Sequence, residues 1–207
     1  MKNLLADNKL DIMFFDRSDW AGDQLRFSWI TGGLLYRLFG GVEVTGGFLN
    51  WQDALRWLAE VEPGQKINSI QFWGHGSPGR VWINNEYLSI RSSYPGNPHR
   101  DLLLKIKSRL TPESTIWFRC CSVFAKEEGH VFATTFSQFM NCRIAAHTHI
   151  IGPWQSGLHS ILPGRQPSWS TQEGVGKNPD GTTKILWSKP WSTNTIFCLT
   201  GKIPEGW

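Results

Sequence analysis

Apolar and polar positions alternate along the chain in a way that predicts strands and helices in turn. Short runs of β-branched and aromatic residues predict strands at 11–16, 67–73, 114–119 and 142–147. Longer stretches with apolar residues three and four positions apart predict helices at 51–61, 100–110 and 127–140. Strands that alternate with helices of this length imply right-handed βαβ units and a mostly parallel sheet.

Weaker patterns complete this prediction. A helix is expected at 29–39, although two glycines interrupt it, and short strands are expected at 42–44, 81–83, 87–90, 184–187 and 195–199. The fold class that follows is α/β: one domain over residues 1–207, with a parallel sheet and helices on both faces. Its core is expected at about 10–152, and the Trp-, Gly- and Pro-rich segment 153–207 is expected to be a loop-rich extension or cap.

Composition narrows the class of protein without choosing a function. A hydrophobic share of 40% and a charged share of 18% in 207 residues are typical of an ordinary globular domain. The net charge of +4 permits acidic partners but does not imply them. Lysines and arginines are spread singly along the chain, and no nucleic-acid motif is present, so we expect no nucleic-acid partner.

The N-terminus and the cysteines bear on the compartment. Residues 1–9 become charged before a signal-peptide core can form, and no segment reaches the roughly 20 apolar residues that span a bilayer. The four cysteines do not form a disulfide framework, because two of them are adjacent. The sequence therefore predicts a cytoplasmic protein with reduced thiols and no membrane partner.

Two of the predicted strands end in residues with catalytic chemistry. The strand at 67–73 is followed by His75, and the strand at 114–119 is followed by Cys120 and Cys121. If these strands are parallel neighbours, a thiol and an imidazole emerge at the same edge of the sheet, as nucleophilic catalysis by cysteine requires. We expect Cys121 to be the nucleophile and His75 its base. The alternative is that Cys121 is a small buried hydrophobic residue and His75 a turn residue.

The glycines around His75 favour close approach of a substrate. Gly74 and Gly76 allow the backbone to bend sharply. The amide of Gly76, together with the amide of Cys121, could then stabilise the oxyanion of a tetrahedral intermediate.

The residues around both strand ends also resemble a known group of proteins. Residues 71–79 read QFWGHGSPG, and residues 121–125 read CSVFA, with Gly129 following. This pattern resembles the caspase-hemoglobinase fold peptidases and is most similar to DUF4347, a bacterial domain family of unknown function. In that family one strand ends in Ser-His-Gly-Ser-Pro-Gly, a later strand ends in Gly-Cys-Asn-Val, and a Gly opens the next helix. The resemblance runs over about 67–152.

The resemblance implies a caspase-like three-layer fold and assigns roles to individual residues. His75 becomes the general base, Cys121 the nucleophile and Gly76 a contributor to the oxyanion site. It also selects Cys121 over Cys120, because Cys121 is followed by Ser-Val and lies eight positions before Gly129. One of two adjacent strand cysteines is expected in the core, since neighbouring side chains point to opposite faces.

The chain departs from the family pattern at two places. Cys120 stands where the family usually has Gly, and His147 and His149 stand where Ser and Asp are expected. Both departures bear on substrate preference.

In the caspase-like fold, residues that follow the first strand often shape the pocket for the side chain before the scissile bond. An acidic floor from Asp16 or Asp19 would favour cleavage after Arg or Lys, whereas Arg17 would favour an acidic residue. The alternative is that Asp16 caps the following turn.

The segment His147-Thr148-His149 admits several interpretations. Side chains two positions apart share a face of a strand, so both histidines could line the edge of the crevice, where His147 would contact substrate. Alternatively, one is in the core and the other is solvated. A zinc site with His159 or a cysteine is less favoured, because no second ligand pair has a standard spacing and a metal would compete for the thiolate. No metal or cofactor is predicted.

These observations predict a cysteine endopeptidase that acts on a protein or peptide through a thioester acyl-enzyme. The alternative from another class is a noncatalytic binding or assembly module that contacts a protein partner through its Trp-rich C-terminal segment. A hydrolase of a nonpeptide acyl bond would use the same Cys121–His75 dyad.

Overall fold

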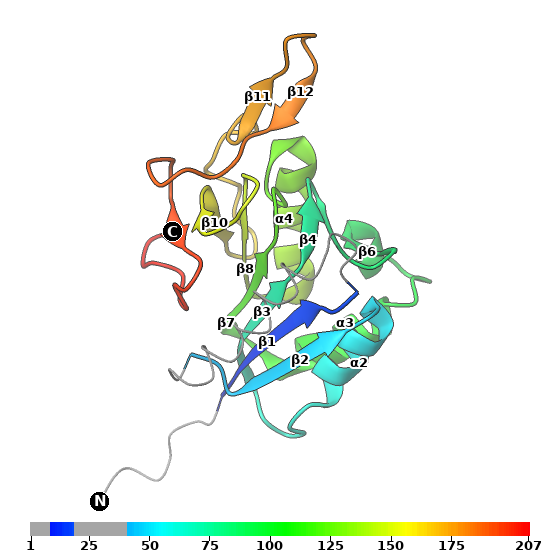
Figure 1. Ribbon diagram of the computed structural model, residues 1–207. Helices are drawn as coiled ribbons and strands as arrows, with labels where there is room; N and C mark the ends of the chain where they lie inside the picture. Colours follow the sequence, from blue (N-terminus) through cyan, green and yellow to red (C-terminus); the bar gives the residue numbers. More distant parts are fainter. Residues whose placement is uncertain (1–8, 19–40) are drawn as a thin grey trace, which may run out of the picture.

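The computed structural model describes residues 9–18 and 41–207. Asp19 and the helix expected at 29–39 lie outside the described residues. A six-stranded sheet forms the centre of the molecule, in the order β10-β8-β7-β3-β1-β2 (Figure 1). Its strands are β1 (Leu10–Asp16), β2 (Val44–Phe48), β3 (Ile67–Trp73), β7 (Leu110–Arg119), β8 (Arg143–His147) and β10 (Leu158–Ile161). Neighbouring strands are parallel except for β10, which pairs with β8 in the antiparallel direction.

The described residues include three α-helices, each close to its predicted place. They are α2 (Trp51–Glu60), α3 (Arg100–Arg109) and α4 (Lys126–Met140). Asn50 begins α2, because its side chain accepts a hydrogen bond from the Asp53 amide at 2.7 Å. Asn141 ends α4 in the left-handed conformation (φ 55°).

All three helices pack on one face of the sheet. Ile12, Phe72 and Phe118 point from their strands into the same cluster as Leu55 of α2, and Ile106 of α3 and Phe136 of α4 belong to it as well. This cluster is the main hydrophobic core. Helices on both faces were expected from the sequence, but every described helix lies on this face.

The C-terminal segment covers part of the opposite face. Trp117 of β7 packs there with Leu158 of β10 and with Ile196, and Trp207 packs against them. Ile196 belongs to β13 (Ile196–Phe197), which pairs with β9 (Trp154–Gln155). Figure 1 shows this orange-to-red segment beside β8 and β10.

Two small sheets complete the described structure and correct two expectations. The expected hairpin is present as β5 (Arg80–Ile83) and β6 (Glu86–Ser89), followed by the short 3-10 helix η1 (Ile90–Ser93), but a further strand, β4 (His75–Ser77), precedes the hairpin and pairs with β5. His75 therefore lies on a strand and not in a turn. The segment expected to be a loop-rich extension contributes β10 to the central sheet, and β11 (Val175–Lys177) pairs with β12 (Thr183–Ile185) farther along.

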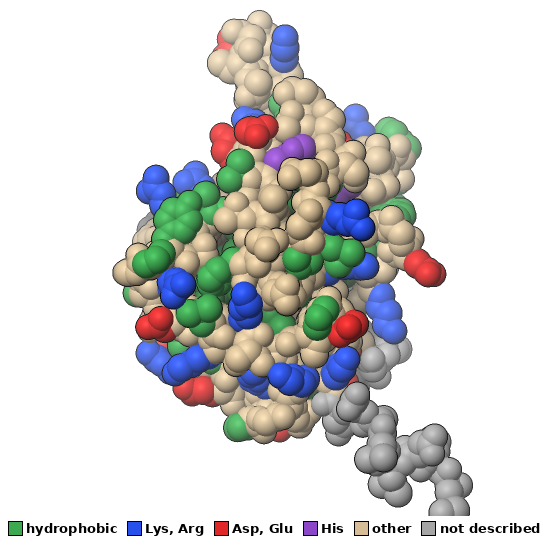
Figure 2. Space-filling view, turned by 180° about the vertical axis from the view of Figure 1, so that it is seen from behind, with side chains coloured by type: hydrophobic (Ala, Val, Ile, Leu, Met, Phe, Trp, Pro, Cys, Tyr) green, Lys and Arg blue, Asp and Glu red, His purple; other side chains and the backbone are tan. Residues whose placement is uncertain are grey.

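The surface agrees with the scattered charge of the sequence. Figure 2 shows basic side chains spread over the face seen from behind, with acidic side chains between them. Within residues 9–18 and 41–207, no helix is long and apolar enough to cross a membrane.

Candidate functional site

The two strands that carry the predicted dyad are parallel neighbours. Strands β3 and β7 pair with Trp73 opposite Arg119. His75 and Cys121 each follow that pair by two positions. Both residues therefore leave the sheet at the same edge and at the same level, as the sequence predicted.

Gly76 brings the two motifs into contact. A Cβ atom placed on Gly76 would lie 2.8 Å from the Cys121 carbonyl oxygen and 2.8 Å from Cys120 Cβ. No ordinary side chain has room there, because real Cβ atoms do not approach other atoms so closely. Glycine at position 76 is thus what allows the His75 segment to lie against the cysteine segment.

The chain turns sharply after Cys121. Ser122 adopts the left-handed conformation (φ 52°), which is uncommon for a residue with a side chain. Its amide donates to the His149 carbonyl oxygen at 2.9 Å, and the Phe124 amide donates to the His147 carbonyl oxygen at 3.0 Å. The end of β8 and the residues just after it therefore hold this turn in place. Left-handed backbone held by its surroundings is often found at functional sites.

Two glycines from neighbouring segments, Gly79 and Gly129, contact the same turn. Gly79, at φ 75°, donates its amide hydrogen to the Val123 carbonyl oxygen at 3.0 Å. A Cβ atom on Gly129 would lie 2.3 Å from the Phe124 carbonyl carbon. The start of α4 can therefore pack closely against the segment after Cys121 only because residue 129 is glycine. The glycine that opens the helix in the sequence pattern therefore has a packing role.

The Cys121 thiol is partly buried and uncharged in its resting form. Its Sγ atom lies 4.0 Å from the Ile151 carbonyl oxygen, which is within the range of a weak hydrogen bond. Burial raises the pKa of this thiol, and the contact with Ile151 offsets only part of that effect. A base is therefore needed to generate the thiolate near neutral pH.

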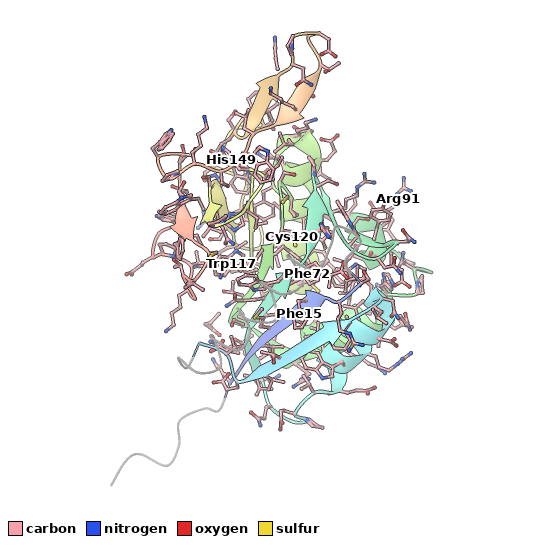
Figure 3. All side chains as sticks on the ribbon, in the orientation of Figure 1. Phe15, Phe72, Arg91, Trp117, Cys120 and His149 are labelled. Carbon is pink, nitrogen blue, oxygen red and sulfur yellow. The ribbon has the colours of Figure 1, made fainter. Side chains whose placement is uncertain are left out.

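Cys120 points in the other direction. It is fully buried within the main core, and its Sγ atom contacts the Phe72 carbonyl oxygen at 3.8 Å. Burial raises the pKa of Cys120 well above its ordinary value. The expectation that one of the two cysteines belongs to the core is confirmed. Figure 3 shows Cys120 at the edge of the sheet where the strands end.

The His75 ring stacks on an aromatic neighbour. Its centroid lies 5.7 Å from that of Trp82, and the two rings are almost parallel at 13°. Trp82 is opposite His75 in the pairing of β4 with β5. The small antiparallel sheet thus fixes the orientation of the imidazole.

Asp16 lies at the carboxyl end of β1 but is almost completely buried, with 1% of its surface exposed. Its Oδ1 atom accepts hydrogen bonds from the Ser18 amide at 2.8 Å and from the Ser18 hydroxyl at 2.5 Å. Its Oδ2 atom accepts from the Asn84 amide at 3.4 Å. These contacts fit the alternative in which Asp16 caps the next turn, and they leave its carboxylate little access to a substrate. Asp19 lies outside the described residues.

His147 is placed in the core and not at the crevice edge. Its side chain has no exposed surface, and its Nδ1 atom lies 3.2 Å from the Ser156 carbonyl oxygen. Because a carbonyl can only accept, Nδ1 carries the proton. Burial, with Arg119 nearby, lowers the pKa of His147 to about 3. A neutral, enclosed imidazole does not contact substrate here, so the expected substrate-binding role does not fit this position.

A buried polar network that the sequence did not predict lies beside the cysteine turn. Glu173 Oε1 accepts hydrogen bonds from the Thr148 hydroxyl at 2.9 Å and from His159 Nε2 at 2.8 Å. The Thr148 hydroxyl also lies 2.9 Å from His149 Nδ1. Burial would raise the pKa of Glu173, but the hydrogen bonds from His159 and Thr148 outweigh it and lower that pKa. Figure 3 labels His149 at this end of the molecule.

Two glycines make this network possible. Gly157 and Gly174 have φ values of 62° and 72°. A Cβ atom on Gly157 would lie 1.8 Å from Thr148 Oγ1, and one on Gly174 would lie 2.2 Å from the Thr148 carbonyl oxygen. In the sequence, the only feature that could have pointed to this network was the glycine after Glu173, because the segment 153–180 has no hydrophobic period.

Arg119 joins the C-terminal segment to the strand that precedes Cys121. Its guanidinium is buried between the rings of Trp73 and Trp117, at 4.3 Å and 4.1 Å from their centroids. The same group donates hydrogen bonds to the carbonyl oxygens of Thr200 and Cys198, both at 2.8 Å. These contacts thus hold the C-terminal segment against the sheet at Arg119, two residues before Cys121 in the sequence.

Among residues 9–18 and 41–207, no cluster of three His, Cys, Asp or Glu side chains could hold a metal ion. None of the four cysteines forms a disulfide bond.

Comparison with known proteins places these features in a family. Residues 47–162 match the family model described as a domain of unknown function, DUF4347. This match covers more than half of the chain. The chain belongs to the DUF4347 family. No curated protein and no solved structure matches it.

The DUF4347 match includes some parts of the site and leaves others out. His75, Gly76, Cys121 and the turn before α4 fall within it. Strand β1 with Asp16 precedes it, and Glu173 and the tail segment held by Arg119 follow it. The part of the site that bears the thiol is therefore shared with the DUF4347 model, whereas its polar support also comes from residues beyond the match.

Proposed function

We propose that this DUF4347 protein is a cysteine endopeptidase in which Cys121 is the nucleophile and His75 the general base. The observation that carries this proposal is the matched position of the two residues after parallel strands β3 and β7. The proposal includes a fold of the caspase-hemoglobinase type. Free thiols at all four cysteines suit a reducing compartment such as the cytoplasm.

The reaction would begin with transfer of the Cys121 thiol proton to the imidazole of His75. The resulting thiolate attacks the scissile carbonyl carbon, and the oxyanion forms near the amides of Gly76 and Cys121. Collapse of this tetrahedral intermediate breaks the C–N bond. The imidazolium gives its proton to the leaving amine, and a thioester remains on Cys121. Water, deprotonated by His75, then hydrolyses the thioester to a carboxylic acid and restores the thiol.

The raised pKa of Cys121 sets a condition on this mechanism. Because burial raises the pKa of the thiol, the thiolate forms only as His75 takes the proton during attack on a carbonyl or another electrophile. The rate of reaction of Cys121 with an electrophile should therefore rise with pH beyond the range at which an exposed thiol ionises.

Cysteine labelling tests the proposal directly. The protein is treated with limiting iodoacetamide at pH 6 to 9, and the modified cysteines are mapped by peptide mass spectrometry. We expect Cys121 to react faster than Cys142, whose buried thiol has a pKa raised to about 12. His75→Asn should slow the labelling of Cys121 roughly tenfold or more, since general-base assistance is typically worth about 10²–10⁴.

A matched variant separates the loss of the base from a loss of structure. His130→Asn removes another imidazole of the same chain, one that packs edge-on against Trp169. This variant should leave the labelling of Cys121 unchanged. Equal labelling of Cys121 in wild type and His75→Asn would contradict the proposed dyad.

A second candidate function is favoured by the same thiol and by the surface of the C-terminal segment. A noncatalytic binding module predicts an ordinary or partly buried thiol, and Cys121 has a raised pKa. Exposed aromatic side chains such as Trp187 and Trp191, at 66% and 80%, could contact a protein partner. Slow labelling of all four cysteines, together with loss of partner binding in Trp187→Ala/Trp191→Ala, would favour this function over hydrolysis.

A further inference from the structure

A hollow, called the edge pocket below, lies at the outer edge of the central sheet, around strand β10. Its volume is about 460 Å³, which falls in the range of small-molecule sites. Its walls come from β10, the first residue of β8, the loop at 162–168 and the chain around Trp207. Figure 1 shows the C-terminal end of the chain beside β10.

Two arginines and one carboxylate, that of Trp207 at the end of the chain, give this edge pocket a net positive charge. Arg143 and Arg165 both line it, and none of its described lining residues is Asp or Glu. Neither guanidinium forms a hydrogen bond or an ion pair with another described side chain. Two unengaged guanidiniums in one hollow favour an anion, because their planar donor groups match carboxylate and phosphate oxygens.

The other polar groups of the edge pocket are partly committed to internal contacts. His159 Nε2 donates to the Glu173 carboxylate, and the Ser160 hydroxyl donates to a carboxylate oxygen of Trp207. These contacts fix the walls. The arginines remain as the positively charged groups that a ligand would engage, with Gln166 and Ser168 as further polar lining residues.

The edge pocket also has apolar walls. Ile161, Leu162 and Trp207 contribute them. A purely inorganic anion would leave this surface unused, whereas an organic anion could bury its carbon part there. We propose that the edge pocket binds a small organic anion, whose carboxylate or phosphate group lies between Arg143 and Arg165.

This pocket is separate from the candidate thiol site. Arg143 is paired with Thr115, which precedes Cys121 by six positions along β7. At about 3.3 Å per residue, Arg143 is roughly 20 Å from Cys121 along the strand direction. His159, at the other end of the pocket wall, is opposite Ala146, which pairs with Phe118, three positions before Cys121. Binding at the edge pocket can thus be tested whether or not Cys121 is catalytic.

Titration calorimetry at low salt tests the proposal with three probes. Phenyl phosphate and phenylacetate carry the two anionic groups, and benzyl alcohol is a neutral analogue of similar shape. We expect at least one anion to bind about tenfold or more tightly than the alcohol, the ratio that about 1.4 kcal/mol gives. The preferred anion identifies the ligand as a phosphate or a carboxylate.

Variants locate the binding. Arg143→Gln/Arg165→Gln should weaken anion binding tenfold or more, and Arg165→Gln alone, at an exposed loop position, should weaken it in the same direction without risk to the fold. Arg91→Gln is the matched control, since Arg91 is exposed and lies away from β10 (Figure 3). Absence of binding by both anions at about 10 mM, or equal binding by wild type and the double variant, would overturn the proposal.

Discussion

The two faces of the central sheet differ in what covers them and in what holds the cover. On the face with α2, α3 and α4, the strands contribute aliphatic and phenyl side chains, and the contact is almost wholly apolar. On the other face, β7 contributes Trp117 and Arg119, and the C-terminal segment is held partly by hydrogen bonds to its carbonyl oxygens. The first face depends on the area buried, and the second depends on donors in particular places.

This difference matters for the candidate site because Arg119 belongs to the second face. Arg119 is the last residue of β7 and lies two positions before Cys121, so the residue that holds the C-terminal segment adjoins the turn that bears the thiol. The face covered by α2, α3 and α4, called the helix face below, therefore supplies stability. The face covered by the C-terminal segment, called the tail face below, contributes Arg119, which adjoins the thiol-bearing turn.

The largest expected effect is on the helix face. Phe72 is fully buried, and its ring centroid lies 4.9 Å from that of Phe14 and 4.7 Å from that of Trp51. Phe72→Ala should lower the free energy of unfolding by about 3–5 kcal/mol, because a cavity replaces the ring. Phe15→Ala makes the same deletion at a partly buried position of the opposite face and should cost less. Urea denaturation of both variants gives the comparison, and equal losses would contradict the distinction between the faces (Figure 3).

The second effect concerns the tail face. Arg119→Ala removes the donor that Gln155, Thr200 and Cys198 share, and it leaves their oxygens without that partner. The expected loss of stability is about 2–4 kcal/mol. Limited proteolysis should then cut within the last dozen residues sooner than in wild type, since those hydrogen bonds hold the segment.

A partly buried arginine controls for the general loss of a guanidinium that donates to backbone carbonyl oxygens. Arg109→Ala removes hydrogen bonds to the Leu58 and Val61 carbonyl oxygens, far from the C-terminal segment in sequence. It should destabilise the protein without faster cleavage of that segment. Unchanged proteolysis of the segment in Arg119→Ala would show that the apolar contacts alone hold it.

The helix face is also the part that could be predicted from the sequence. The helices at 51–60, 100–109 and 126–140 and the strands β3 and β7 lie within a few residues of their expected bounds. Their apolar periodicity reports burial against a continuous apolar surface, which is a local property of the sequence. The proximity of His75 to Cys121 followed from the same strands.

The tail face could not be predicted in this way. Strand β10 has a buried, half-buried, half-buried, buried pattern over four residues, too short for a period to emerge. Glu173 finds Thr148 and His159 only because glycines at 157 and 174 leave room for close approach. Contacts that depend on the left-handed backbone of single residues have no signature in hydrophobic patterning.

A third prediction sharpens the comparison at the point where the motifs meet. Gly76→Ala places a methyl group 2.8 Å from the Cys121 carbonyl oxygen and 2.7 Å from Val123 Cγ2, so the backbone has to move. We expect a cost of about 1–3 kcal/mol and slower labelling of Cys121. Gly152→Ala is the control, because no atom lies within 4 Å of its Cβ position. Normal labelling in Gly76→Ala would show that the dyad does not need the close approach.

The last prediction is a pH dependence on the tail face. The folded protein lowers the pKa of His147 to about 3, below its ordinary value of 6.5. The unfolded chain therefore takes up a proton between these two pH values and the folded protein does not, so stability falls as the pH decreases through that window. The slope is about 1.4 kcal/mol per pH unit for one such group. His147→Phe keeps a ring beside Trp117 but removes the titration, and its stability, measured by urea denaturation from pH 7 to pH 4, should decline less steeply than that of wild type. Parallel curves for the two proteins would contradict the prediction, because they would mean that folding does not lower the pKa of His147.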